Sequence, residues 1–136
     1  MFTVNSAAFD PRTVHISNMT SPRTGNTVSN QFVIDSSRYS FFQSYASLVA
    51  VYDKNERSIT LGHAWNYSKT TLKYLKMWLE SDAFNAWAYI RDEFRGRTLS
   101  ETIRKAIDAG VIEYDCDIAG VIDYYSGAID YDCDME

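Results

Sequence analysis

The sequence predicts an α+β fold, in which a small antiparallel sheet packs against two or three helices. Three features support this prediction: alternating apolar and polar residues near 41–62, apolar residues at helical spacing after residue 68, and a capping box at Thr98. An acidic C-terminal segment adds short strands to this unit. The fold class follows from these patterns without any catalytic or cofactor motif.

The chain has 136 residues, the common size of a single domain. Residues 1–30 are rich in Ser, Thr and Asn and indicate a mobile leader with at most one short strand. Residues 31–110 form the expected α+β core. Residues 111–136 are the acidic segment, which we expect to belong to the same domain.

The sheet is predicted from two apolar strands that flank a polar turn. An aromatic-rich strand extends from Phe41 to Tyr52, and Arg57–Leu61 alternates polar and apolar residues. Residues 53–56 are polar, so the two strands form an antiparallel hairpin. Gln31–Asp35 is a further short strand.

Three helices are predicted from apolar residues that recur every three or four positions. Ser68 and Ser81 are the expected N-caps of the first two, and Thr98 with Glu101 forms the capping box of the third. Gly110 ends the third helix. The buried stripes consist of Leu72, Leu75, Trp78 and Leu79, of Phe84, Trp87, Ala88 and Ile90, and of Ile103, Ala106 and Ile107.

Charge is unevenly distributed along the chain. Residues 1–105 carry 13 Lys and Arg against 9 Asp and Glu, whereas residues 106–136 carry no Lys or Arg and 9 acids, for a net charge of −5. Such asymmetry indicates an electrostatic interaction surface. No apolar run approaches the ~20 residues that span a bilayer, and the first residues lack a signal-peptide pattern. We therefore expect a cytoplasmic protein with no membrane partner.

The two cysteines, Cys116 and Cys133, lie in identical Tyr-Asp-Cys-Asp contexts. A disulfide is possible in principle. Because no secretion signal is present, free and buried thiols are favoured.

The acidic segment contains a short near-repeat of the form Gly-x-Ile-acid-Tyr, at residues 110–114, 120–124 and 127–131. In a strand, alternate residues face opposite sides, so Ile112, Tyr114, Cys116 and Ile118 face a core while the acids face outward. Carboxylates two residues apart lie roughly 6.6–6.8 Å apart, a spacing comparable with that of phosphates along a nucleic-acid strand. The row can therefore imitate a phosphate backbone. The predicted partner-binding residues are Glu113, Asp115, Asp117, Asp123, Asp130, Asp132 and Asp134.

Two other interpretations of the acids remain open. They can form a solvated face, or a disordered tail, that keeps the protein soluble. A metal site is a weaker alternative, because residues 130–134 resemble a calcium loop but lack its sixth-position Gly and later Glu. We predict no metal ligand.

A second candidate surface is a lysine face on the first helix. Lys69, Lys73 and Lys76 are four and three residues apart, so they share one side of the helix. Together with Tyr67 and Tyr74 they can hold nucleic acid by charge and stacking. The alternative is a solvated lysine face over a packed aromatic core.

Catalysis has no support in the sequence. A P-loop, a Gly-rich dinucleotide turn, a His-Glu-x-x-His motif and a Cys-x-x-Cys motif are all absent. His63 lies at a strand end, where a lone histidine is more often structural. We predict a protein that is not an enzyme and has no cofactor.

The segments Phe42–Tyr45 and Trp65–Leu75 resemble a group of small phage and plasmid proteins of Gram-positive bacteria. Those proteins contain Phe-Gln-Ser-Tyr, then Trp-Asp-Tyr-Ser-x-Thr-Thr-x-Lys-Tyr, then a short helix ending in Ile-x-x-Gly. Here Asn66 replaces the Asp, and Ile107–Gly110 matches the ending. The resemblance covers about residues 40–110. It implies an origin on a mobile element and assigns no catalytic residue.

These observations favour a phage-encoded, anti-CRISPR-like inhibitor of a host nucleic-acid-binding defence enzyme, with its acidic surface in the DNA channel of a CRISPR effector. Such a protein would act in the host cytoplasm without binding nucleic acid itself. The alternative is a small nucleic-acid-binding or regulatory phage protein that uses the lysine face. A structural or self-assembling protein is a third possibility.

Overall fold

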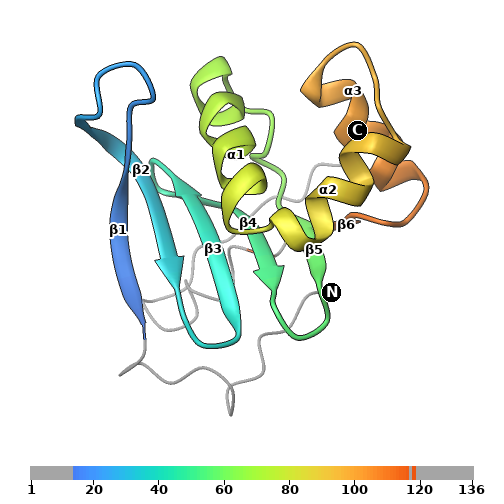
Figure 1. The fold of residues 1–136 in the computed structure, drawn as a ribbon, viewed down its shortest axis with the longest axis horizontal. Helices are drawn as coiled ribbons and strands as arrows, with labels where there is room; N and C mark the ends of the chain where they lie inside the picture. The colour runs from blue at the N-terminus through green and yellow to red at the C-terminus, as the bar shows by residue number, and fades with distance from the viewer. Residues whose placement is uncertain (1–13, 117, 119–136) are drawn as a thin grey trace.

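The computed structural model describes residues 14–116 and 118, which form the α+β fold that the sequence predicts (Figure 1). Within these residues one sheet of six strands packs against three helices. The elements in chain order are β1 His15–Thr20, β2 Thr27–Asp35, β3 Tyr39–Ser44, β4 Ser47–Asp53, β5 Ser58–Leu61, α1 Lys69–Ser81, α2 Phe84–Glu93, α3 Leu99–Asp108 and β6 Glu113–Tyr114.

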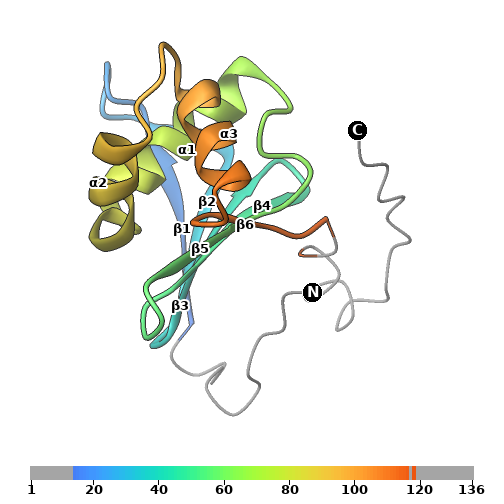
Figure 2. The ribbon, with the colours of Figure 1, turned by 90° about the vertical axis from the view of Figure 1, so that its right-hand side faces the viewer.

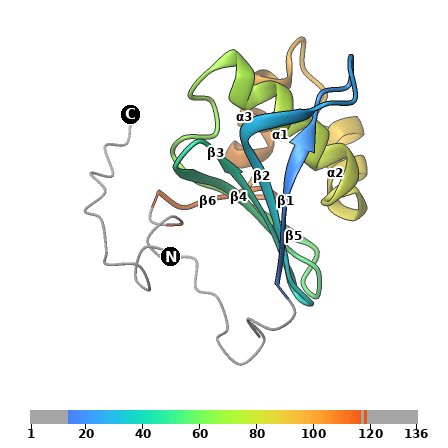
Figure 3. The same ribbon diagram turned by 90° about the vertical axis from the view of Figure 1, so that its left-hand side faces the viewer.

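The strands are ordered β1-β2-β3-β4-β5-β6 across the sheet. The first five form an antiparallel meander, and β6 pairs parallel to β5 after the three helices. The helices all lie on one side of the sheet (Figures 1 and 2). Strand β1 forms an outer edge (Figure 3). None of the described helices is long and apolar enough to cross a membrane.

Residues 15–20 and 27–30 belong to the sheet and residues 21–26 connect them, which differs from the leader predicted for residues 1–30. Strand β1 pairs with β2 from His15↔Asp35 to Thr20↔Thr27. The hairpin shows little apolar alternation because most of β1 is exposed, and only Met19 in it is buried. Residues 1–13 lie outside the described part of the chain.

The predicted hairpin is present, but its first strand is divided in two. A tight turn at Tyr45 and Ala46 separates β3 from β4, where the sequence predicts one strand from Phe41 to Tyr52. Tyr45 has a positive φ of 56°. Its backbone N–H donates to the Asn30 carbonyl at 2.6 Å, and its carbonyl accepts from Gln43 Nε2 at 2.9 Å. The turn therefore depends on strand β2 and a side chain, not on Gly or Pro.

The core lies between the sheet and the helices, and Trp78 is at its centre. Trp78 is fully buried, and its ring stacks on Phe42 with centroids 6.5 Å apart. Its indole Nε1 donates to the Ser40 hydroxyl at 3.0 Å, which satisfies both buried polar groups. Leu75 and Leu79 are also fully buried, as the helical spacing predicts.

Two of the three predicted N-caps are confirmed. The Ser68 and Thr98 side chains accept hydrogen bonds from the N–H groups of Thr71 and Glu101. The prediction that Ser81 caps the second helix is wrong. Ser81 is the last residue of α1, and its hydroxyl donates to the Met77 carbonyl at 2.8 Å.

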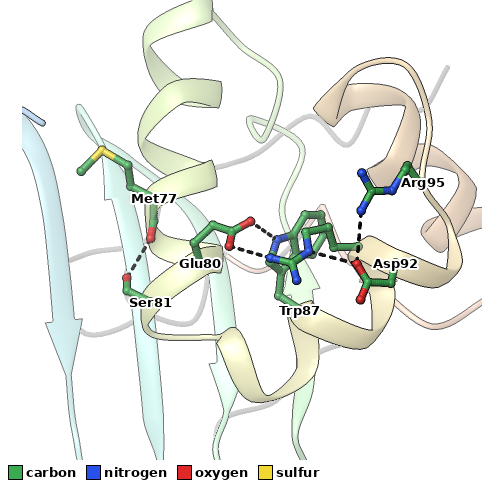
Figure 4. A network of polar contacts seen from close by, with 7 residues as sticks. Met77, Glu80, Ser81, Trp87, Asp92 and Arg95 are labelled. Carbon is green, nitrogen blue, oxygen red and sulfur yellow. Dashed lines mark hydrogen bonds and ion pairs between the residues drawn. The ribbon is translucent and has the colours of Figure 1, made fainter.

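A polar network joins α1 to α2 beside the core (Figure 4). Glu80 accepts from Trp87 Nε1 at 2.9 Å and from Arg91 Nη1 at 3.0 Å. Arg91 and Arg95 both contact Asp92 at 3.3 Å. The network provides an acceptor for the buried indole N–H of Trp87 and links the end of α1 to α2.

An ion pair lies at the opposite end of the sheet from the β3–β4 turn. Asp53 accepts from Arg38 Nε and Nη2 at 3.1 and 3.0 Å and from two backbone N–H groups of the turn that follows it. Burial alone would raise the pKa of Asp53. The hydrogen bonds and the positive charge of Arg38 outweigh burial and lower this pKa below its ordinary value of 3.8.

Because the folded pKa is lower than the unfolded one, ionised Asp53 stabilises the fold at neutral pH. This contribution is lost as the pH falls below 3.8 towards the folded pKa. We expect Asp53→Asn to lower the free energy of unfolding by about 1.5 kcal/mol at neutral pH, with a smaller difference from the wild type in acid. Urea unfolding of both proteins at neutral and at acid pH measures this difference in the free energy of unfolding. Asp92→Asn, at an exposed pair, is the control and should cost under about 0.5 kcal/mol; equal losses for both variants would contradict the assignment.

Candidate functional site

The two motifs singled out in the sequence meet at the N-terminal end of α1. Ser44, the third residue of Phe-Gln-Ser-Tyr, ends β3, and Thr71 lies in the first turn of α1. Their hydroxyl groups are 3.0 Å apart and both are buried. Residues 27 positions apart in the sequence are thus joined directly.

The start of α1 is organised by Ser68. Its hydroxyl accepts the Thr71 N–H at 3.1 Å and donates to Thr71 Oγ1 at 3.1 Å. The side chains of Lys69 and Thr70, the first two helical residues, are exposed. In any α-helix the first N–H groups have no partner within the helix, so this exposed end carries a partial positive charge.

A cavity of about 600 Å³ opens between this helix end and the β3–β4 turn. We call it the α1 pocket. Its walls carry no charged side chain but seven hydroxyl-bearing ones. Tyr45 is 48% exposed and Tyr67 is 77% exposed, so two aromatic rings lie at its accessible side. The pocket is lined by Ser44, Tyr45, Ala46, Ser47, Val49, Ala64, Tyr67, Ser68, Thr70 and Thr71.

Gln31 does not line this pocket but pairs with Ser44, which does, and its amide is unsatisfied. It is 0% exposed, and neither its amide nitrogen nor its amide oxygen has a hydrogen-bond partner. It pairs with Ser44 across β2 and β3. Directly opposite residues project from the same face, so Gln31 points to the helix side next to the Ser44 wall of the pocket.

The lysine face adjoins the pocket. Lys69, Lys73 and Lys76 are all exposed, and none forms an ion pair in the described part of the chain. Most other cations are neutralised locally, as in the Arg38–Asp53 pair. The lysine face is therefore a concentration of uncompensated positive charge.

The structure changes which aromatic residues accompany the lysines. Tyr74 is only 5% exposed and belongs to the core, with Lys73 Nζ 5.4 Å from its ring centroid. It is not available to stack on a ligand. Tyr67 is available, and Tyr45 joins it from a different strand connection.

Two of the seven predicted acidic partner-binding residues lie in the described part of the chain. Glu113 is exposed in β6, and its carboxylate accepts from the Thr60 hydroxyl at 3.4 Å. The Asp115 N–H donates to the Leu61 carbonyl at 2.9 Å, which ties the segment to β5. The other five, Asp117, Asp123, Asp130, Asp132 and Asp134, lie outside the described residues.

The alternation predicted for the start of the acidic segment holds in part. Ile112, Cys116 and Ile118 are buried, while Glu113 is exposed. The strand itself is only two residues long. Among the described residues, Glu113 is exposed and Asp115 is half-buried, so the predicted row of outward acids stays a prediction.

The prediction of free thiols is wrong for Cys116, which is disulfide-bonded. Burial fits either state of this side chain, which is 8% exposed. The sequence alone does not determine whether a cysteine is free or paired. Cys133, the other cysteine, lies outside the described residues.

The described residues contain no group of three or more His, Cys, Asp or Glu side chains that could hold a metal ion. His63 is exposed just after β5. The site that the described residues offer is therefore one of hydroxyls, aromatic rings and lysines.

Comparison with known families locates this site within a shared domain. A family of unknown function, DUF8033, matches residues 14–96. The chain belongs to the DUF8033 family. The DUF8033 match includes the α1 pocket and the lysine face and ends before α3 and the acidic segment. No curated protein and no solved structure matches the chain.

The sequence identified the lysine face but not the α1 pocket. The signal available was the pair of hydroxyl-rich motifs, in which Ser44 and Tyr45 precede Ser68, Thr70 and Thr71. Hydroxyl residues are common at turns and caps. Their convergence became visible only when β3 and α1 were placed side by side.

Proposed function

We propose that this DUF8033 protein is a non-catalytic binding protein that holds nucleic acid on the lysine face of α1. The observation that carries the proposal is a group of three exposed lysines beside a pocket with two accessible tyrosine rings. None of these lysines forms an ion pair with another described residue. The alternative function considered from the sequence thus has the more complete surface. Five of the seven residues expected to form the acidic surface lie outside the described part of the chain.

The physical basis is phosphate neutralisation. Lys69, Lys73 and Lys76 occupy successive turns on one side of α1, with a rise of about 1.5 Å per residue, so they can contact neighbouring phosphates. Each phosphate neutralised releases condensed counterions, and affinity falls with salt in proportion to the number of contacts. Because acids elsewhere repel the polyanion, binding is expected only where the lysines are.

The lysine face is tested by removing its three positive charges. A control variant loses three positive charges elsewhere, so that the two variants have the same net charge. We expect Lys69→Gln, Lys73→Gln and Lys76→Gln together to weaken binding of labelled oligonucleotides about tenfold or more. The slope of log K against log salt should fall by about 2–3. Fluorescence anisotropy at low and high salt measures both quantities.

The matched control removes three exposed arginines elsewhere: Arg57→Gln, Arg95→Gln and Arg97→Gln. These lie in the β4–β5 turn and between α2 and α3, and the control should retain most of the affinity and salt slope. Equal losses in the two triple variants would mean that only overall charge matters. A wild-type protein that binds neither single- nor double-stranded nucleic acid at low salt would rule out the proposal.

The charge segregation of the chain favours a second candidate, the anti-CRISPR-like inhibitor. Residues 106–136 carry nine acids and no Lys or Arg, and Glu113 presents the first outward carboxylate of this segment. Its proposed partner is the basic DNA channel of a host CRISPR effector. Charge reversal at Asp130, Asp132 and Asp134 should then abolish inhibition of the target nuclease. Inhibition that survives this change would exclude the acidic surface as its cause.

A further inference from the structure

We infer that the α1 pocket receives one unpaired base of the bound strand, so that the protein prefers single-stranded to double-stranded nucleic acid. This inference rests on the proposed function and names its substrate class. A base held in a helical duplex is stacked on both sides and cannot enter a side pocket.

The shape and lining of the pocket suit a base. Its volume of about 600 Å³ lies within the range of small-molecule sites. Tyr45 and Tyr67 offer exposed ring faces from two different segments. Aromatic stacking is the usual way in which single-stranded bases are held, because every base has a flat face.

The end of α1 suits the phosphate that accompanies this base. Thr70 adds a hydroxyl to the exposed first turn, and Ser47 adds another from the opposite wall. Lys69 continues directly into the lysine face. A nucleic-acid strand bound along the lysines would therefore have its phosphates neutralised by them, and one of its bases would lie beside the tyrosines at the pocket.

The amide of Gln31, which is buried behind Ser44 and does not line the pocket, lacks a hydrogen-bond partner in the described structure. A buried polar group without a partner is costly and rare in folded proteins. An amide carries a donor and an acceptor side by side, which is the pattern that base edges present. We assign the missing partner to the edge of the base, which reaches this amide only when the Ser44 side chain leaves its 3.0 Å contact with Thr71.

Tyr67 provides the first test, because its exposed ring can be removed without disturbing the core. We expect Tyr67→Ala to weaken binding of a single-stranded oligonucleotide about tenfold, with little change for a duplex of the same length. Tyr89→Ala is the matched control, since Tyr89 is 62% exposed on α2, away from the pocket lining. It should change neither affinity.

Gln31 provides the second test, because a ligand role and a structural role move the readouts differently. Gln31→Met keeps the size of the side chain and removes the two unsatisfied atoms. We expect its melting temperature without ligand to rise and its affinity for the single strand to fall. A melting temperature that falls would show that the amide already has a structural partner.

The outcomes separate this inference from the proposed function. If the lysine triple variant weakens single strands and duplexes while Tyr67→Ala and Gln31→Met leave the single-strand preference unchanged, the lysine face stands and the base pocket is excluded. If the wild type shows no preference for single strands, the pocket inference is also excluded. If no nucleic acid binds at all, both fail together.

Discussion

Replacing Trp78 with alanine should lower the free energy of unfolding by about 3–5 kcal/mol, the usual cost of removing a buried aromatic ring. Trp78 is completely buried and stacks on Phe42, so its loss leaves a cavity between α1 and β3 that neither element can close alone. It also leaves the buried Ser40 hydroxyl without its indole donor. Both effects act in the same direction.

Urea unfolding followed by the fluorescence of Trp65 and Trp87, which remain, measures this loss. Trp78→Phe separates the two effects, because a phenyl ring refills most of the cavity but cannot donate to Ser40. We expect it to cost about 1–2 kcal/mol, mainly from the unpaired hydroxyl. A loss under about 1 kcal/mol for Trp78→Ala would mean that Trp78 is not at the centre of the core.

The helices could be predicted from sequence because their determinants are local. The Ser68 and Thr98 caps bond to N–H groups three residues ahead, and the stripe containing Leu75 and Trp78 repeats with the helical period. Ser81 failed as a cap because α1 continues to it and its hydroxyl bonds backward to Met77. A serine in this position has both options, and the local sequence does not choose between them.

The strand boundaries were harder to predict from the sequence because tertiary contacts determine them. The turn at Tyr45 contains neither Gly nor Pro, and its backbone is held by Asn30 and Gln43. The β1–β2 hairpin was also hard to predict. Most residues of β1 are exposed, so the strand shows no alternation of apolar and polar residues. In both places the pairing partner, not the local sequence, determines the conformation.

The candidate site also divides into a part set by local sequence and a part set by tertiary contacts. Lys69, Lys73 and Lys76 share a helix, so their common face follows from their spacing. Tyr45 and Tyr67 come from different connections, and only the Ser44–Thr71 contact brings those connections together. The burial of Tyr74 could not be predicted either, because its position in the helix is compatible with a place in the core or on the surface.

Gly62 is the position where a single added methyl group should have the second largest effect. Gly62 follows β5, and its N–H donates to the Val49 carbonyl at 2.8 Å. A Cβ there would overlap Cγ2 of Ile118 and lie 3.2 Å from the Leu48 carbonyl oxygen. Ile118 is fully buried, and the carbonyl belongs to the sheet, so neither neighbour can move freely. We expect Gly62→Ala to cost about 3 kcal/mol, the upper end of the range for overpacking.

A double-variant cycle identifies the overlap as the cause. Ile118→Ala removes Cγ2, so it should relieve part of the strain. The pair should therefore be less destabilised than its two single variants predict, by about 1–2 kcal/mol. Ile103→Ala removes an equally buried isoleucine from α3 and should add independently to Gly62→Ala. Equal coupling for both isoleucines would show only general loss of stability. Specific coupling to Ile118 would show that the residues after β6 pack on the sheet at Gly62, which anchors the start of the acidic segment to the DUF8033 domain.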